Sequence, residues 1–91
     1  MRIRDGFMLR EIAGQWVVVP IGEQTVEYAR LLTLSESGAL LWKRLEQGAE
    51  MVDLLEAIRM EYSVDEETAQ ADILSFIESL DMQSLLEPDG E

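Results

Sequence analysis

One short stretch, residues 30–42, changes from strand-type to helix-type sequence and constrains the fold most. It reads Arg-Leu-Leu-Thr-Leu-Ser-Glu-Ser-Gly-Ala-Leu-Leu-Trp. The chain has three short apolar or β-branched runs before Ser35 and three amphipathic segments after it. A serine hydroxyl at a helix start can accept from a backbone N–H two or three residues later, so Ser35 is expected to cap a helix that directly follows a strand. The predicted fold is α+β, in the order β-β-β-α-α-α.

The first third of the chain predicts a small antiparallel sheet. Residues 7–12 and 15–19 form a hairpin in this interpretation, with Ala13-Gly14 as its turn. A third strand is expected within residues 29–34, directly before the capping serine. The sheet is therefore predicted to have three strands.

Two of these strands do not alternate between apolar and polar residues. Residues 16–19 and 31–34 are apolar on both pleat faces, although a sheet in so small a domain can bury only one face against its own helices. The edge of the third strand could accept a visiting peptide strand. Alternatively, a short twisted strand could tuck both faces under neighbouring loops and helices. Both interpretations stay open on the residues alone.

The rest of the chain predicts three helices. The first spans about residues 36–46 and carries Trp42 on its core face, with Gly48 as its stop. The second spans residues 51–62. The third is capped by Ser63 or Asp65. Its expected core stripe consists of Ala69, Ile73, Phe76, Ile77 and Leu80. Trp16, in contrast, is expected at the surface or at a dimer contact.

The length and composition predict one domain held together by packing alone. A chain of 91 residues with 47% hydrophobic residues forms one core, here assigned to residues 1–87, with residues 88–91 expected to be disordered. Cysteine and histidine are absent, which removes thiol nucleophiles, disulfides and the commonest zinc ligands. Adjacent acids such as Asp65 and Glu66 face different directions at a helix start, so they form neither a catalytic carboxylate pair nor a metal site. No catalytic residues, metal or cofactor are expected.

No segment predicts a membrane or export role. The first residues contain two cations but no apolar run behind them, and no run approaches the ~20 apolar residues that span a bilayer. A cytoplasmic protein with no membrane partner is expected.

The charge distribution argues against nucleic acid as a partner. All seven cations lie before residue 60 together with nine acids, for a net charge of −2, whereas residues 60–91 contain ten acids and no cation, for a net charge of −10. A helix that reads DNA needs cations on the face that contacts the phosphates. The acidic segment is either a solvated face that keeps the protein soluble or a surface that attracts basic peptide segments.

Leu74 is the one apolar residue at the border of this acidic face. At 100° per residue around Ile73, Leu74 lies near 100°, beside the core stripe. Its neighbours on the helix surface are Gln70, Glu67, Asp81 and Glu78. A single exposed leucine is ordinary, so a contact role needs a second argument.

The motif at the change from strand-type to helix-type sequence supplies that argument, because it resembles the PqqD-like family. The resemblance is carried by Leu-Ser-Glu-Ser-Gly-Ala-Leu-Leu-Trp at 34–42, by Trp-Val-Val-Val-Pro at 16–20, by Leu54-Leu55 through Glu61-Tyr62, and by Leu-Leu-Glu at 85–87. Two positions depart from the family pattern. Ser35 stands where Asn is common, and Met-Gln-Ser at 82–84 stands where a glycine turn is frequent.

The resemblance implies a winged-helix-like peptide-binding module, a RiPP recognition element. Such a module is a non-catalytic adaptor that holds the leader segment of a ribosomally made precursor peptide and presents it to a modifying enzyme, for example a radical-SAM enzyme. The leader would add a strand along residues 30–34, against the third helix. The predicted peptide-binding residues are Arg30, Leu31, Leu32, Thr33, Leu34, Gln70, Leu74, Ile77 and Asp81. The alternative is a regulatory winged-helix module that binds protein rather than DNA, or a homodimer whose second copy covers the third strand.

Overall fold

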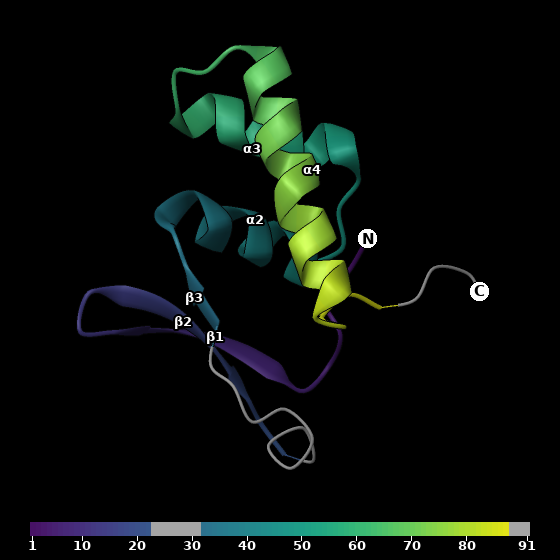
Figure 1. Ribbon diagram of the computed structural model, residues 1–91. Coiled ribbons are helices and arrows are strands. Elements are labelled where there is room, and N and C mark those ends of the chain that lie inside the picture. Colours follow the sequence, from purple (N-terminus) through teal and green to yellow (C-terminus); the bar gives the residue numbers. More distant parts are fainter. Residues whose placement is uncertain (23–31, 88–91) are drawn as a thin grey trace.

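The computed structural model describes residues 1–22 and 32–87, and within them it has the predicted α+β, winged-helix-like order (Figure 1). The elements are β1 (Phe7–Ile12), β2 (Gln15–Pro20), β3 (Leu32–Leu34), α2 (Glu36–Glu46), α3 (Met51–Glu61) and α4 (Glu66–Met82). The expected disordered tail at 88–91 and the expected first part of the third strand, residues 29–31, lie outside the described residues.

The three strands form one antiparallel sheet in the order β1-β2-β3. The hairpin between β1 and β2 turns at Ala13 and Gly14, whose φ angles are 52° and 80°. A two-residue hairpin turn needs positive φ at both central positions to match the strand twist. The predicted turn is therefore confirmed, although Ala13 occupies a conformation that favours glycine or asparagine.

Both faces of β2 are covered, as its apolar sequence suggested. Val18 is fully buried in the main core cluster. Its neighbour Val17 points to the opposite pleat face and is also buried, outside that cluster. Trp16 is half-buried, and the Nζ of Lys43 on α2 lies 4.3 Å from its ring centroid. Trp16 thus packs against the protein's own helix through a cation–π contact.

The strand-to-helix switch has the predicted geometry. Ser35 is extended, with φ −71° and ψ 172°, and its Oγ accepts a hydrogen bond from the Gly38 amide at 3.1 Å. The helix α2 ends at Glu46 with Gln47 as its C-cap, and Gly48 follows with φ 86°. Both predicted boundaries are confirmed, because each depends on the chemistry of a residue at the boundary itself.

The other two helices have acidic N-cap residues. Glu50 begins α3 in a capping box with Asp53, and the Glu50 amide donates to Asp53 Oδ2 at 2.8 Å. Of the two candidate caps for α4, the structure selects Asp65, whose carboxylate accepts from the Thr68 amide at 3.4 Å.

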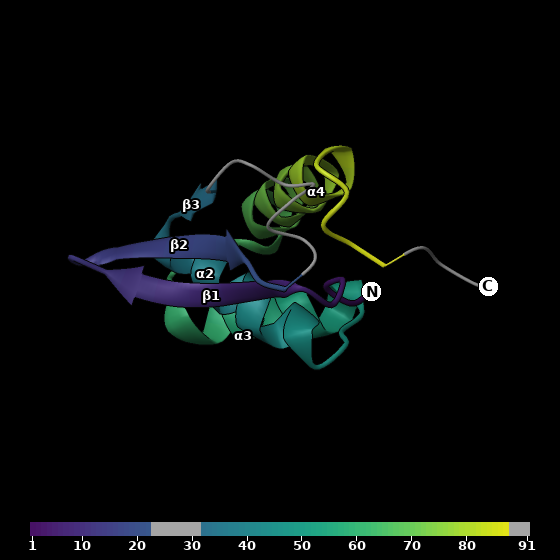
Figure 2. The ribbon, with the colours of Figure 1, turned by 90° about the horizontal axis from the view of Figure 1, so that it is seen from below.

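One core joins the sheet and the helices. Trp42 is fully buried at its centre, and its Nε1 donates to Glu46 Oε2 at 3.0 Å. The predicted stripe on α4 is present, but its members differ in burial: Ala69, Ile73 and Leu80 are buried, whereas Phe76 and Ile77 are half-buried on its two flanks. Seen from below, α4 lies on the β3 side of the sheet (Figure 2).

The first and last described segments pair with each other beside α4. Ile3 and Leu86 form an antiparallel bridge. Around it the Arg4 amide donates to the Leu85 carbonyl at 2.9 Å, and the Glu87 amide donates to the Arg2 carbonyl at 2.9 Å. These bonds hold the first and last described segments together. None of the helices in the described ranges is long and apolar enough to cross a membrane.

Candidate functional site

The outer edge of β3 is the first candidate for binding. In the described residues β3 pairs only with β2, so the backbone groups along its other edge have no strand partner there. Leu32 and Leu34 are half-buried against the core, and Thr33 between them is exposed. An unpaired edge without charged residues is a template for a further strand.

The opposite edge of the sheet is protected differently. β1 carries Arg10 and Glu11 near its end, and both are exposed. Charged side chains on an edge strand discourage pairing with another chain. Of the two edges, β3 is the one suited to strand addition.

Phe76 on α4 lies against the start of α2, which directly follows β3. A Cβ atom placed on Gly38 would lie 3.3 Å from Phe76 Cε1 and 3.5 Å from Leu34 Cβ. Glycine at the start of α2 therefore lets the end of β3 and the Phe76 flank of α4 approach closely. A pocket of about 430 Å³ opens at this junction. It is lined by Ser35, Ser37, Gly38, Leu41, Ile58, Tyr62, Val64, Asp72, Ile73, Ser75, Phe76 and Ser79.

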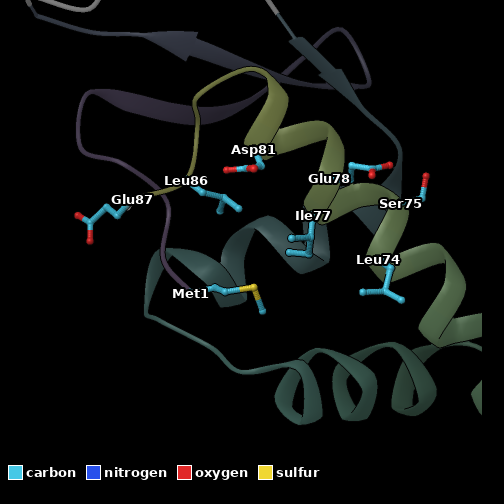
Figure 3. Close-up of a pocket in the computed structure, with 8 residues that line it drawn as sticks. All are labelled: Met1, Leu74, Ser75, Ile77, Glu78, Asp81, Leu86 and Glu87. Carbon is cyan, nitrogen blue, oxygen red and sulfur yellow. The ribbon is translucent and has the colours of Figure 1, made fainter. Parts of the chain in front are cut away.

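The α4 residues predicted from the sequence gather elsewhere. Leu74, Ile77 and Asp81 line a pocket of about 720 Å³ together with Met1, Ser75, Glu78, Leu86 and Glu87 (Figure 3). Neither this lining nor that of the pocket beside Phe76 includes a residue of β3, but the latter contains Ser35, which directly follows β3. At 100° per residue, Leu74 and Phe76 lie on opposite flanks of Ile73, and it is the Phe76 flank that lies against Gly38, close to the end of β3. Gln70 is exposed and lines neither pocket.

The predicted site residues therefore separate into two groups. Leu32, Thr33 and Leu34 form β3, whereas Leu74, Ile77 and Asp81 line the pocket on the flank of α4 opposite Phe76. Arg30 and Leu31 fall outside the described residues. Phe76 was expected in the core stripe, and Ser79 and Asp72 were not among the expected site residues. That these three side chains line one pocket with the start of α2 depends on the direction in which α4 crosses the core, which no local pattern shows.

One carboxyl group among the described residues, that of Asp65, has a pKa shifted from its ordinary value. Hydrogen bonding from Thr68 lowers the pKa of the Asp65 carboxyl at the start of α4, and the positive charge of Arg59 adds to the effect. In residues 1–22 and 32–87 no group of three or more acidic side chains is placed to hold a metal ion.

A comparison with protein-family models identifies the family of this chain. Residues 15–86 match the model of the family described as coenzyme PQQ synthesis protein D (PqqD). The chain belongs to the PqqD family. This membership agrees with the resemblance carried by the motif at 34–42, and the match includes β2, β3 and all three described helices.

Two solved structures resemble this PqqD-family protein over almost its entire length. TbiB1 in complex with the TbiA(beta) leader peptide is 30% identical, with a TM-score of 0.79 and 100% of both chains covered. A lasso peptide synthetase B1 complexed with the leader peptide is 23% identical, with a TM-score of 0.76 and 96% of both chains covered. The second likeness supports the fold alone. No curated protein matches the sequence.

Proposed function

We propose that this PqqD-family protein is an adaptor that binds the leader segment of a ribosomally synthesised precursor peptide and presents it to a modifying enzyme. The observation that carries the proposal is the likeness to TbiB1, which is 30% identical over the whole of both chains and was solved with a leader peptide bound. The uncharged edge of β3 supplies a physical basis for the same activity in this chain.

The proposed binding mode is strand addition. A leader segment extended along β3 would pair with the backbone of Leu32–Leu34, so that main-chain hydrogen bonds supply affinity and side-chain pockets supply selectivity. The lining of the pocket beside Phe76 includes Ser35, the residue that directly follows β3. We infer that one apolar side chain of the leader enters it.

The adaptor would contribute proximity rather than chemistry. Holding a tethered substrate near an enzyme raises its local concentration to about the millimolar range. The modifying enzyme, for example a radical-SAM enzyme, would supply the reaction. Turnover of a precursor by this protein alone would contradict a purely binding role.

The first test is a titration with a fluorescent leader peptide. The probes are the leader of a precursor encoded beside this protein and, as a reference, the TbiA(beta) leader. We expect Ser79→Trp to fill the pocket beside Phe76 and to weaken binding at least tenfold, which corresponds to about 1.4 kcal/mol. Ser79 is exposed, so the fold should tolerate the change.

The matched control is Met60→Trp on α3, because Met60 is exposed and lines neither this pocket nor the one beside Leu74. Its affinity should equal that of the unmodified protein. Amide resonances of residues 32–34 should shift on saturation. Equal affinity for both tryptophan variants with unshifted β3 amides would refute strand addition. A concentration-dependent mass in sedimentation would instead favour a homodimer formed through β3.

A further inference from the structure

The pocket beside Leu74 has a preformed apolar floor. Figure 3 shows the side chains of Met1, Ile77 and Leu86 pointing toward one another from three different segments, with Leu74 further along α4. The walls are held by backbone bonds: the Ala49 amide donates to the Met1 carbonyl at 2.8 Å, and Leu86 is bridged to Ile3. Leu74 is 51% exposed. The volume of about 720 Å³ lies within the range of ligand sites.

The rim of this pocket carries three carboxylates and no lysine or arginine side chain, and the Met1 ammonium group donates to the Ala49 carbonyl at 2.9 Å. Glu78, Asp81 and Glu87 line it. The one ion pair found in the described part of the chain joins Arg59 and Glu66 at 3.6 Å, at the other end of α4. The cation in the adjoining pocket is Arg2, which donates to the Gln47 carbonyl at 3.5 Å. The three carboxylates therefore have no ion-pair partner among the described residues.

Two of these acids, Glu78 and Asp81, lie near the C-terminal end of α4, where negative charge destabilises a helix. The C-terminal end of a helix carries partial negative charge and is stabilised by cations. The last turn of α4 contains Asp81 and no basic residue. Unpaired acids at this end oppose the stability of the isolated protein, whereas a cation bound from outside would be favoured by both the carboxylates and the helix dipole.

We propose that this pocket is a docking site for a basic segment of the modifying enzyme, with one apolar side chain on the floor formed by Leu74 and Ile77 and with lysine or arginine at the acidic rim. The inference rests on the adaptor function proposed above. It assigns the two flanks of α4 to two partners. The leader lies on the Phe76 flank beside β3, and the enzyme approaches the flank opposite.

Charge complementarity selects this occupant over a second copy of the chain. The protein has a net charge of −12, and the segment before residue 60, which contains all seven cations, also contains nine acids and has a net charge of −2. Negative charges on two copies would repel one another over a distance of about 10 Å at 0.1 M salt. A basic partner is attracted to the same surface.

The test uses a synthetic eight-residue peptide that alternates leucine and lysine, added to the full-length ¹⁵N-labelled protein. Two control peptides replace lysine by glutamate or leucine by serine. We expect amide shifts in residues 74–81 with the first peptide and at least tenfold weaker binding of both controls. Leu74→Ser and the double variant Glu78→Lys/Asp81→Lys should each weaken binding of the first peptide at least tenfold.

Two matched variants on α3 separate the pocket from general effects of charge and apolarity. Val52→Ser removes an exposed apolar residue, and Glu56→Lys/Glu61→Lys makes the same change in net charge. Both should change binding less than twofold. Equal losses in the α3 and α4 variants would overturn the proposal, because binding would then follow net charge rather than the pocket.

A parallel leader titration distinguishes failure of this inference from failure of the adaptor function. Unchanged leader affinity in Leu74→Ser supports two separate flanks. Loss of leader affinity in that variant would overturn the inference and assign Leu74 to the leader groove, as the sequence predicted. Pocket-selective binding of the basic peptide without any leader binding would refute the adaptor function alone.

Discussion

At the scale of single residues, Asp65 links the start of α4 to pH. Its carboxylate accepts from the Thr68 amide, and hydrogen bonding from Thr68 lowers its pKa below the ordinary value of 3.8. A lowered pKa in the folded state means that folding favours the charged carboxylate. Its stabilising contribution is therefore fully present above pH 3.8 and is lost as the pH falls through the lower folded-state value.

We expect Asp65→Asn to keep an acceptor at the cap but to remove this dependence on pH. The melting temperature of the variant should fall less between pH 6 and pH 3 than that of the unmodified protein, as followed by circular dichroism. Asp72→Asn, an exposed change within the same helix, serves as the control. Parallel pH profiles for the unmodified protein and Asp65→Asn would show that the cap charge does not contribute.

At the scale of elements, the end of α4 departs from the most favourable local sequence. Ser84 has a φ of 61°, a left-handed conformation that costs a residue with a side chain roughly 1–2 kcal/mol. This is the position at which the resemblance leads one to expect a glycine turn. The carbonyl of Ser84 accepts from Arg4 Nη1 at 2.9 Å, so the backbone conformation is held by the first segment of the chain.

Ser84→Gly should therefore stabilise the protein by about 1 kcal/mol, after allowing for the greater freedom of glycine in the unfolded chain. Urea denaturation measures the change. Ser79→Gly, inside α4, should act in the opposite direction by about the same amount, because glycine is a poor helix former. A loss of stability in Ser84→Gly would mean that the serine side chain makes a compensating contact.

The elements also show which features a sequence can predict. Ser35, Gly48 and Asp65 mark helix ends through their own hydrogen bonds or backbone preferences, so these boundaries were predicted to the residue or as one of two candidates. The flank of α4 that lies against the start of α2 cannot be predicted in this way. Leu74 and Phe76 flank the same stripe, and only the direction in which α4 crosses the core decides which of them lies against Gly38.

At the scale of the whole molecule, Leu85 fastens the last described segment to the core. It is fully buried, its amide donates to the Leu80 carbonyl at 2.9 Å, and its carbonyl accepts from Arg4. Leu85→Ala should cost about 2–5 kcal/mol, a large part of the 5–15 kcal/mol typical of a small protein. Chemical denaturation should show a lower midpoint, whereas Met82→Ala, at an 80% exposed residue, should change it little.

The pairing of Ile3 with Leu86 has a consequence for building chimeric proteins. Because the two ends of the described chain meet beside the pocket lined by Met1 and Glu87, a domain fused by a short linker to either end would leave from the same corner. That corner lies on the flank of α4 away from the open edge of β3. An enzyme grafted there would work at an effective concentration of about millimolar, while the edge on which a guest strand would lie stays unobstructed.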